Sequence, residues 1–402
     1  MMRHFSFLSD EQASRLFHVA PTDLSVESPP SLLAAALGAT LYSPGIRPDL
    51  AADVRKQAAR GAVSIVLCLE DSIADADIPQ AEQNVVAALH TLASVADFPQ
   101  QDVNDGAQDA LPMLFVRIRT PEQMLLVAER AGDDLRVLTG FVLPKFENET
   151  GRGQRFFDAL HVIQGRAGGA TAHLRVMPIL ESPVLIHAET RAAALANIAA
   201  VLGRNRRNVL AVRIGTTDLS SAFGLRRSRD FTIYDVKVVS AVIGDIVNVL
   251  GRRDDGFVIT GPVWEHFADT ERLLRPMLRL TPFVESSDED LRRRLLLGNV
   301  DGLMREIALD HANGLLGKTV IHPSHVPVVH ALSVVSHEEF LDAEAIRDDS
   351  GGGAAPSPSG NKMNEMRPHQ AWAERTLLQA AAFGVAAPDV TYVDLLEASL
   401  GS

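Results

Sequence analysis

The sequence predicts a (β/α)8 barrel, the TIM-barrel architecture, followed by a C-terminal helical appendage. Short apolar runs alternate with longer segments of helical period, which is typical of parallel βα units. Eight such units fit within roughly 290 residues, which favours a closed barrel over an open doubly wound sheet. The runs are almost continuously apolar, as expected for strands that are buried on both faces.

The predicted strands share a short, β-branched or apolar composition. They are Ala39–Pro44, Ser64–Asp71, Met113–Arg119, Gly140–Phe146, Leu174–Glu181, Val209–Gly215, Gly256–Thr260 and Lys318–His322. Apolar residues recur at helical spacing in the segments between them. These predicted helices include Leu50–Arg60, Pro79–Leu92, Pro121–Ala131, Val184–Leu202 and Asp235–Leu250.

Composition shifts divide the chain into four parts. Residues 1–36 form an N-terminal extension, expected to be a short helix and a covering loop, and residues 37–345 form the barrel. Residues 346–360 contain the run DDSGGGAAPSPSG and predict a flexible linker. Residues 361–402 form the appendage, with a predicted helix over Met366–Val385. Within the sequence range assigned to the barrel, Ala96–Ala110 is rich in Asp, Gln and Asn, which predicts a surface loop.

Charge and cysteine content restrict the compartment and the partners. The 402-residue chain carries a formal net charge of −13, so neither nucleic acid nor an anionic membrane is an expected partner. Its single cysteine, Cys68, cannot form an internal disulfide, which fits a reducing compartment. No signal-like segment opens the chain and no apolar run has membrane-spanning length, so we expect a cytoplasmic protein.

Polar residues follow most of the predicted strands, and in a βα barrel such positions face the active site. Glu181 and Asp218 follow neighbouring strands, so their carboxylates are expected to converge. Two carboxylates together with water and substrate oxygens suit Mg²⁺, with Mn²⁺ as an alternative. For each carboxylate alone, capping of the next helix or pairing with a lysine is the competing interpretation.

Arg117 and Arg119 lie two residues apart, which places them on one face of a continuous strand. A guanidinium suits bidentate binding of a substrate carboxylate. Alternatively, Arg119 is a structural partner of Asp71 or Glu70. Lys145, after the fourth strand, is a second candidate for charge stabilisation, and Asp71 is a candidate for proton transfer.

Eight segments, in order along the chain, resemble motifs of the citrate lyase β-subunit and related aldolases. They are Tyr42–Gly45 (YSPG), Leu69–Ile73 (LEDSI), Phe115–Ile118 (FVRI), Leu143–Glu147 (LPKFE), Ile179–Ser182 (ILES), Ile214–Leu219 (IGTTDL), Gly314–Val326 (GLLGKTVIHPSHV) and Lys362–Met363. The resemblance runs from about residue 40 to residue 385 and is carried by the motifs together. The chain resembles a divergent branch, similar to the barrel lyase-like proteins of tellurium-resistance clusters.

The resemblance implies a TIM barrel that holds Mg²⁺ through Glu181 and Asp218 and grips a substrate carboxylate or enolate with Arg117. It further implies catalytic roles for Glu70, Asp71 and Lys145, and substrate contacts from Pro44 and Gly45. Arg119 is a candidate substrate contact from its position beside Arg117 alone. Glu365 aligns with an acid that follows the family's "GKM" segment. A homotrimer or hexamer is implied as well, with the appendage covering the active site of a neighbouring subunit.

The expected function is therefore a Mg²⁺-dependent carbon–carbon lyase or aldolase. Its substrate would be a small 2-oxo or 3-hydroxy acid, or an acyl thioester such as a CoA ester. A pyruvate-type aldolase that acts on aldehydes without CoA remains open. The alternative from another class is a catalytically retired barrel that binds a ligand or acts as a scaffold. Arg119, where the family has Asn, and Pro183, after the metal-binding motif, favour that alternative.

Overall fold

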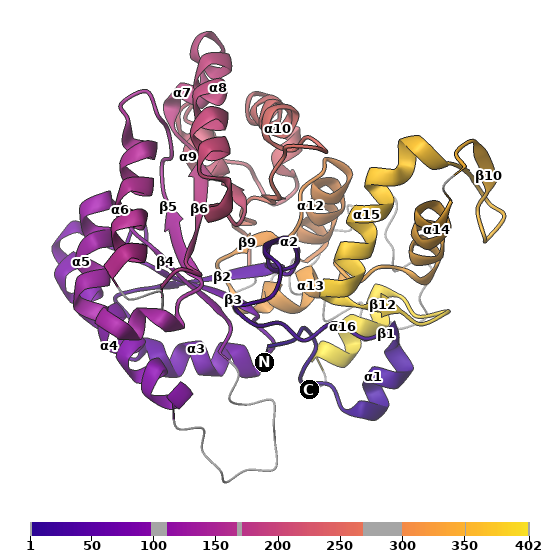
Figure 1. Ribbon diagram of the computed structural model, residues 1–402, viewed down its shortest axis with the longest axis horizontal. Coiled ribbons are helices and arrows are strands. Elements are labelled where there is room, and N and C mark those ends of the chain that lie inside the picture. Colours follow the sequence, from indigo (N-terminus) through magenta and orange to yellow (C-terminus); the bar gives the residue numbers. More distant parts are fainter. Residues whose placement is uncertain (1, 98–110, 167–170, 268–299, 350, 401–402) are drawn as a thin grey trace.

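A computed structural model describes residues 2–97, 111–166, 171–267, 300–349 and 351–400 of the chain. Eight parallel strands form one sheet in the order β8-β7-β6-β5-β4-β3-β2-β9. A parallel bridge between Gly261, just after β8, and Lys318 of β9 connects the two outer strands. The sheet is thus nearly closed into a barrel, with helices around its outside (Figure 1), and the predicted fold class is confirmed.

Each barrel strand lies within one of the predicted apolar runs. The strands are β2 (Ala39–Pro44), β3 (Ser64–Cys68), β4 (Met113–Arg117), β5 (Gly140–Leu143), β6 (Arg175–Leu180), β7 (Val212–Ile214), β8 (Ile259–Thr260) and β9 (Lys318–Val320). Several strands end earlier than the predicted runs. Residues such as Glu70, Lys145 and Glu181 therefore lie just past the hydrogen-bonded strands, where loop backbone can direct them into the barrel mouth.

The helices of the outer layer follow the strands in sequence. They are α3 (Leu50–Ala59), α4 (Ile78–Asp97), α5 (Pro121–Ala131), α6 (Arg152–Arg166), α7 (Pro183–Ile186), α8 (Ala188–Arg204), α9 (Thr216–Ser221), α10 (Lys237–Leu250), α12 (Val300–Ala312) and α13 (Val326–Ala331). The single helix predicted over Val184–Leu202 is instead two, because His187 has extended backbone angles (φ −80°, ψ 128°).

Side chains alternate between the barrel interior and the layer beneath the helices. On β4, Met113 and Phe115 belong to an apolar cluster with inward-facing Val142 and Met177, whereas Leu114 and Val116 belong to the larger cluster that includes the outer helices. The period of two places Arg117 on the inner face, above Phe115. By the same alternation Arg213 of β7 faces inward, as does Ala211 just before this strand.

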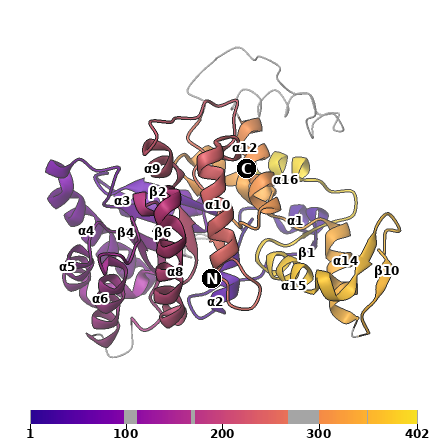
Figure 2. The ribbon, with the colours of Figure 1, turned by 90° about the horizontal axis from the view of Figure 1, so that it is seen from above.

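The N-terminal extension contains α1 (Asp10–Leu16), β1 (Phe17–Val19) and α2 (Pro30–Ala35). Besides the expected helix and loop, it supplies a strand, because β1 pairs antiparallel with β12 (Val385–Ala386) near the other end of the chain. Figures 1 and 2 show the extension beside the appendage. The extension thus ties the appendage to the barrel rather than forming a separate unit.

The appendage contains β11 (Met363–Glu365), α15 (Met366–Phe383) and α16 (Tyr392–Leu400). Two elements before it, α14 (His337–Asp348) and β10 (Ala354–Pro356), pack against α15 and pair with β11, respectively. The Gly/Pro/Ser-rich segment 346–360, expected to have no regular structure, differs: α14 extends to Asp348 and β10 pairs antiparallel with β11. The Asp349 side chain accepts hydrogen bonds from the backbone N–H groups of Gly351 and Gly352, which fixes the turn before β10.

Two further sequence expectations concern loops and membranes. The predicted surface loop Ala96–Ala110 lies largely outside the described residues. Among the described helices, none combines the length and the apolar composition needed to cross a lipid bilayer.

Candidate active site

Arg117 is the centre of a cluster of charged groups at the C-terminal ends of the strands. One of its terminal nitrogens, Nη2, lies 2.7 Å from Glu70, 3.3 Å from Asp71 and 3.1 Å from Glu181. Arg117 and Glu181 are both nearly buried. These carboxylates hold the pKa of Arg117 above its usual range against the effect of burial, so the guanidinium is a permanent cation.

Glu70 and Asp71 form an adjacent carboxylate pair in the loop after β3. The backbone N–H of Asp71 donates to Glu70 Oε2 at 2.7 Å. Burial raises the pKa of Glu70, whereas hydrogen bonds from its surroundings hold the pKa of the more exposed Asp71 below its usual value despite partial burial. The pair therefore contains one carboxyl that protonates more readily than the other.

Lys145 crosses to this pair from the loop after β5. Its Nζ lies 2.6 Å from Glu70 and 3.0 Å from Asp71, and its backbone N–H donates to Glu181 Oε1 at 2.9 Å. The residue has a positive φ of 48°, a left-handed conformation that is costly for a side chain with a β-carbon. The two carboxylates raise the pKa of Lys145 against desolvation. A protonated ammonium fits charge stabilisation and not nucleophilic attack.

Glu181 lies at the end of β6 against a bare stretch of backbone. A β-carbon at Gly215, after β7, would lie 2.0 Å from Glu181 Oε2. Burial, with the negative charges of Asp218 and Glu70, raises the pKa of Glu181 to about 7 although Arg117 opposes this shift. The positive charge around Glu181 therefore does not fully offset its burial and its carboxylate neighbours.

The residues present fit a divalent cation. Glu70, Asp71, Glu181 and Asp218 bring four carboxylates together, against the two cations Arg117 and Lys145. When all six groups are ionised, the cluster has a net charge of −2, which one Mg²⁺ would balance. No group of three or more His, Cys, Asp or Glu side chains in the described part of the chain is arranged as a metal cage. Mg²⁺ commonly binds one or two carboxylates and keeps several waters, so a pair such as Glu181 and Asp218 would suffice to hold it.

Arg119 does not join this cluster, which corrects the expectation that it faces a substrate together with Arg117. The strand ends at Arg117, so strict alternation no longer applies two residues later. The Arg119 guanidinium donates to the backbone carbonyls of Leu69 and Ile73 at 2.8 and 2.6 Å and pairs with Asp75 at 2.7 Å. It is therefore a structural brace for the loop that carries Glu70 and Asp71.

Pro44 is the last residue of β2, and Gly45 begins the turn that follows. The backbone N–H of Gly45 donates to the carbonyl of Cys68 at 2.8 Å, and a β-carbon on Gly45 would lie 2.9 Å from the Leu69 side chain. The turn thus packs closely on the end of β3.

Glu365, the remaining predicted site residue, ends β11 in the appendage. Both views place the β10–β11 hairpin at the edge of the molecule, away from β4 and β6 (Figures 1 and 2). The backbone N–H of Glu365 donates to His369 Nδ1 at 3.1 Å. Within one chain, the fold therefore does not bring Glu365 to the carboxylate cluster.

The model of one protein family, the "C-C_Bond_Lyase of the TIM-Barrel fold", matches residues 31–385. The chain belongs to this carbon–carbon bond lyase family. Among solved structures, malate synthase from Haloferax volcanii in a magnesium/glyoxylate complex is 14% identical, with a TM-score of 0.51 over 86% of this chain and 88% of that chain. Its similarity supports the fold.

Two other solved structures are similar at lower TM-scores. CitE from Mycobacterium tuberculosis, in complex with magnesium, acetoacetate and coenzyme A, is 22% identical, with a TM-score of 0.49 over 86% of this chain and 99% of that chain. RipC from Yersinia pestis is 16% identical, with a TM-score of 0.45 over 74% of this chain and 95% of that chain. No curated protein matches the chain.

Two inward-facing residues of this family member were not singled out by sequence reasoning. Tyr42 of β2 and Arg213 of β7 lie in the barrel interior, with the Arg213 Cζ atom 5.7 Å from the centre of the Tyr42 ring. The signal for Arg213 was present, because a charged residue interrupts the apolar run Val209–Gly215 in the phase of the inward-facing Ala211. Tyr42 appeared only as part of a motif.

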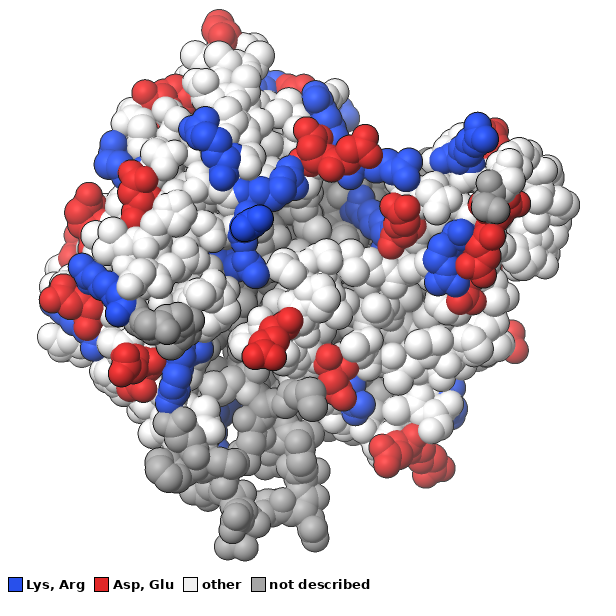
Figure 3. All heavy atoms as spheres, viewed as in Figure 1, with Lys and Arg blue, Asp and Glu red and all other residues white. Residues whose placement is uncertain are grey.

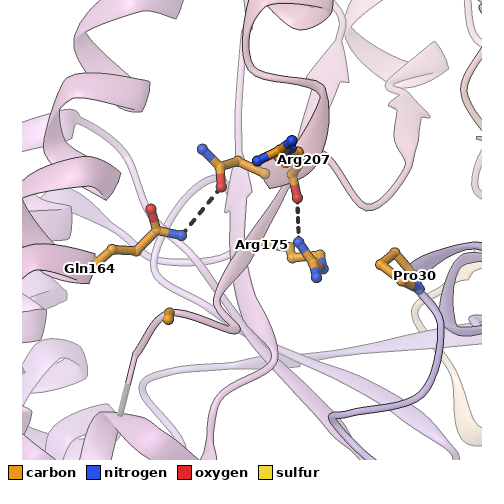
Figure 4. Close-up of a pocket in the computed structure, with 6 residues that line it drawn as sticks. Pro30, Gln164, Arg175 and Arg207 are labelled. Carbon is orange, nitrogen blue, oxygen red and sulfur yellow. Dashed lines mark hydrogen bonds between the residues drawn. The ribbon is translucent and has the colours of Figure 1, made fainter. Parts of the chain in front are cut away.

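A separate cavity lies at the opposite end of the strands. It has a volume of about 390 Å³ and is lined by Pro30, Gln164, Ala172, Arg175, Arg207 and Asn208 (Figure 4). Arg175 is the first residue of β6, whereas Glu181 follows the last one, so this cavity and the carboxylate cluster are distinct.

Figure 3 shows Lys and Arg side chains gathered near the middle of one face, so the net negative charge does not form a continuous acidic surface there.

Proposed function

We propose that this chain is a Mg²⁺-dependent carbon–carbon lyase or aldolase that acts on a small 2-oxo or 3-hydroxy acid or its acyl thioester. The observation that carries the proposal is the contact of 3.1 Å between Arg117 and buried Glu181, with the Asp218 carboxylate nearby. Family membership supports the reaction class. The malate synthase structure contains magnesium and glyoxylate, and the proposal extends that kind of ligand to this chain.

In this proposal Glu181 and Asp218 hold the metal ion, which supplies Lewis acidity when bound. Arg117, fixed by three carboxylates, binds the substrate carboxylate and stabilises the negative charge that develops as the carbon–carbon bond breaks or forms. Lys145 adds a second fixed positive charge beside Glu70 and Asp71. Asp71, which is half exposed, is the candidate within the chain for moving a proton.

Glu365 enters this proposal only through a second copy of the chain. It is too remote within one chain, so we propose a homotrimer or hexamer in which the appendage of one subunit covers the barrel mouth of another. A Glu365→Gln substitution would then lower turnover in the assembled protein without altering Mg²⁺ binding.

The metal site is tested by calorimetric titration of Mg²⁺ into the wild-type protein and into the Glu181→Gln/Asp218→Asn double variant. We expect the variant to lose about ten-fold or more in affinity, because both anionic ligands become neutral amides. Asp75→Asn is the matched control, since Asp75 is highly exposed and pairs with the bracing Arg119. Equal Mg²⁺ affinity in wild type and double variant would contradict the proposed site.

The substrate is sought by ligand-induced thermal shift, with small 2-oxo and 3-hydroxy acids and their CoA esters, each with and without Mg²⁺. The proposal expects stabilisation that depends on Mg²⁺, followed by turnover of the stabilising compound. Mg²⁺-dependent binding without turnover of any stabilising compound would favour the retired barrel instead.

A further inference from the structure

Arg213 is a cation enclosed in the barrel without a carboxylate partner in the part of the chain that the structure describes. Its side chain is 1% exposed. Its guanidinium donates to Thr40 Oγ1 at 3.1 Å and Thr319 Oγ1 at 2.6 Å and approaches the sulfur of Met177. Burying a charge without an opposite charge is costly, so buried charges in proteins are usually paired or bind a ligand.

The groups around Arg213 are hydroxyls and not anions. Tyr42 lies near both Arg213 and Arg117, and burial raises the pKa of its phenol despite these cations, so it supplies no negative charge. Thr260 is the neighbour of Arg213 in register on β8, and its buried Oγ1 has no hydrogen-bond partner among the described residues. The wall around the guanidinium thus retains unused hydrogen-bonding capacity.

The hydroxyl groups have a defined polarity. A guanidinium only donates hydrogen bonds, so the oxygens of Thr40 and Thr319 accept from Arg213. Each hydroxyl hydrogen is then free to be donated elsewhere. Because Arg213 occupies an acceptor position on Thr40 and Thr319, their hydroxyl hydrogens point away from the guanidinium. Hydroxyl groups oriented in this way can donate hydrogen bonds to an anion.

Arg213 lies one step of the strand below Glu181, one of the two proposed metal ligands. In the parallel register Arg213 is paired with Ile179, two residues before Glu181, and Gly215 packs on Glu181 two residues after Arg213. Thr319 is only partly buried, and Ile321, which follows the end of β9, is 45% exposed. The Thr319 hydroxyl that accepts from Arg213 therefore belongs to a residue that solvent reaches in part.

The charges around the proposed metal site can balance without giving Arg213 an anion of its own. With Arg213 included, four carboxylates face three cations and leave one negative charge. A divalent cation on Glu181 and Asp218 reverses the sum to one positive charge. One substrate carboxylate on Arg117 brings the sum to zero, while Arg213 still has no carboxylate partner among the described residues.

We propose that Arg213, with the hydroxyls of Thr319 and Tyr42, forms a subsite that selects ligands with a second anionic group, a carboxylate or a phosphate. The inference rests on the proposed function, because the first anionic group is the one assigned to Arg117. Thr319 and Tyr42 donate to the second group, and Arg213 is a positioning and charge-balancing residue beneath them.

The test uses matched probes that differ in one group. Succinate, butyrate and 3-phosphonopropionate are titrated into the full-length protein with saturating Mg²⁺. Butyrate replaces one carboxylate of succinate by a methyl group, and the phosphonate replaces it by a phosphate-like group. We expect the wild type to bind at least one of the two-group anions about ten-fold or more tightly than butyrate, since charge-assisted hydrogen bonds are lost with the methyl group. The tighter of the two identifies the group.

Variants then locate the selectivity. Arg213→Met should lower the affinity for the preferred two-group anion by about ten-fold while butyrate changes little, and Thr319→Val and Tyr42→Phe should each lower it less. Arg47→Met, which removes an exposed surface arginine, is the control. If Arg213→Met does not fold, the wild-type probes and the two hydroxyl variants decide the question.

The inference is overturned if the wild type does not distinguish the two-group anions from butyrate, or if the variants preserve the discrimination. Its failure is separable from failure of the proposed function, because Mg²⁺ binding is measured without any organic ligand. Selective binding of succinate by a protein that fails the Mg²⁺ test would support the subsite and contradict the metal-dependent lyase.

Discussion

Gly215 and Glu181 are in such close contact that position 215 has no room for any side chain. A β-carbon there would lie 2.0 Å from Glu181 Oε2 and 2.6 Å from Glu181 Cβ. The glycine precedes α9, the short helix that contains Asp218, so its close approach brings the two proposed metal ligands together. The spacing from Gly215 to Asp218 is therefore part of the site.

Gly215→Ala is expected to weaken Mg²⁺ binding about ten-fold or more, because Glu181 must move away from Asp218 to avoid the new methyl group. Calorimetric titration measures the loss, and circular dichroism establishes that the protein is folded. Gly203→Ala is the matched control, since Gly203 lies in α8 and a β-carbon there meets no atom within 4 Å. Unchanged Mg²⁺ affinity in Gly215→Ala would show that Glu181 does not hold the metal.

Arg117→Lys separates a substrate clamp from a structural ion pair. Lysine keeps the charge that Glu70, Asp71 and Glu181 surround but loses the planar fork, so folding should persist. Transition-state stabilisation should fall by roughly 2–4 kcal/mol, as for a lost oxyanion donor. Steady-state kinetics on the substrate found by screening gives kcat/KM. Normal turnover by the variant, or its unfolding, would contradict the assignment of Arg117 as the residue that binds the substrate carboxylate.

Lys318→Met should be among the most destabilising single changes in this chain. The Lys318 ammonium is 1% exposed and lies 2.9 Å from Glu306 and 2.7 Å from Asp310, both buried on α12. Removing it leaves two buried carboxylates with less positive charge, which typically costs about 3–5 kcal/mol. Urea unfolding measures this loss. Arg47→Met breaks an exposed pair with Asp53 and should cost no more than about 1 kcal/mol. Similar losses in both variants would argue against the buried network as a stabilising element.

Two buried histidines, His4 and His330, lead us to expect that the free energy of unfolding falls at acid pH. Nε2 of His4 donates to the carbonyl of Ala36 at 2.9 Å. Nε2 of His330 accepts from the N–H of Ala39 at 3.2 Å, a bond that requires the neutral ring. Burial lowers the pKa of His4 to about 4 and the pKa of His330 well below its usual value.

Because these folded-state pKa values lie below the unfolded value of 6.5, their stability contribution is complete above that pH. It decreases as the pH falls toward 4, since protons bind preferentially to the unfolded chain. His4→Gln keeps a hydrogen-bond donor without titrating and should flatten this loss by up to about 3 kcal/mol. Urea unfolding at several pH values between 7 and 4.5 measures the slope. Parallel slopes for the wild type and His4→Gln would contradict the assignment to His4.

The sequence was sufficient to locate the barrel strands because the barrel buries both faces of its sheet. A strand in that environment must be apolar along its length, so the runs beginning at Ala39, Ser64 and Met113 mark β2, β3 and β4 at their first residues. Polar residues after such runs then lie at one end of the barrel by topology alone. This is why Glu70, Arg117 and Glu181 could be grouped from their positions in the chain and were found in contact.

Only the tertiary structure decided how individual charges are used. Arg117 and Arg119 are alike in sequence, but the strand ends between them, so one faces three carboxylates and the other braces a loop through backbone carbonyls. Arg213 needed the register between β6 and β7 to place it beneath Glu181. The sequence by itself determined which residues must be buried, because burial follows composition and period. The partner of each buried charge depends on distances of a few ångströms between segments far apart in the chain, and those distances are set only when the barrel closes.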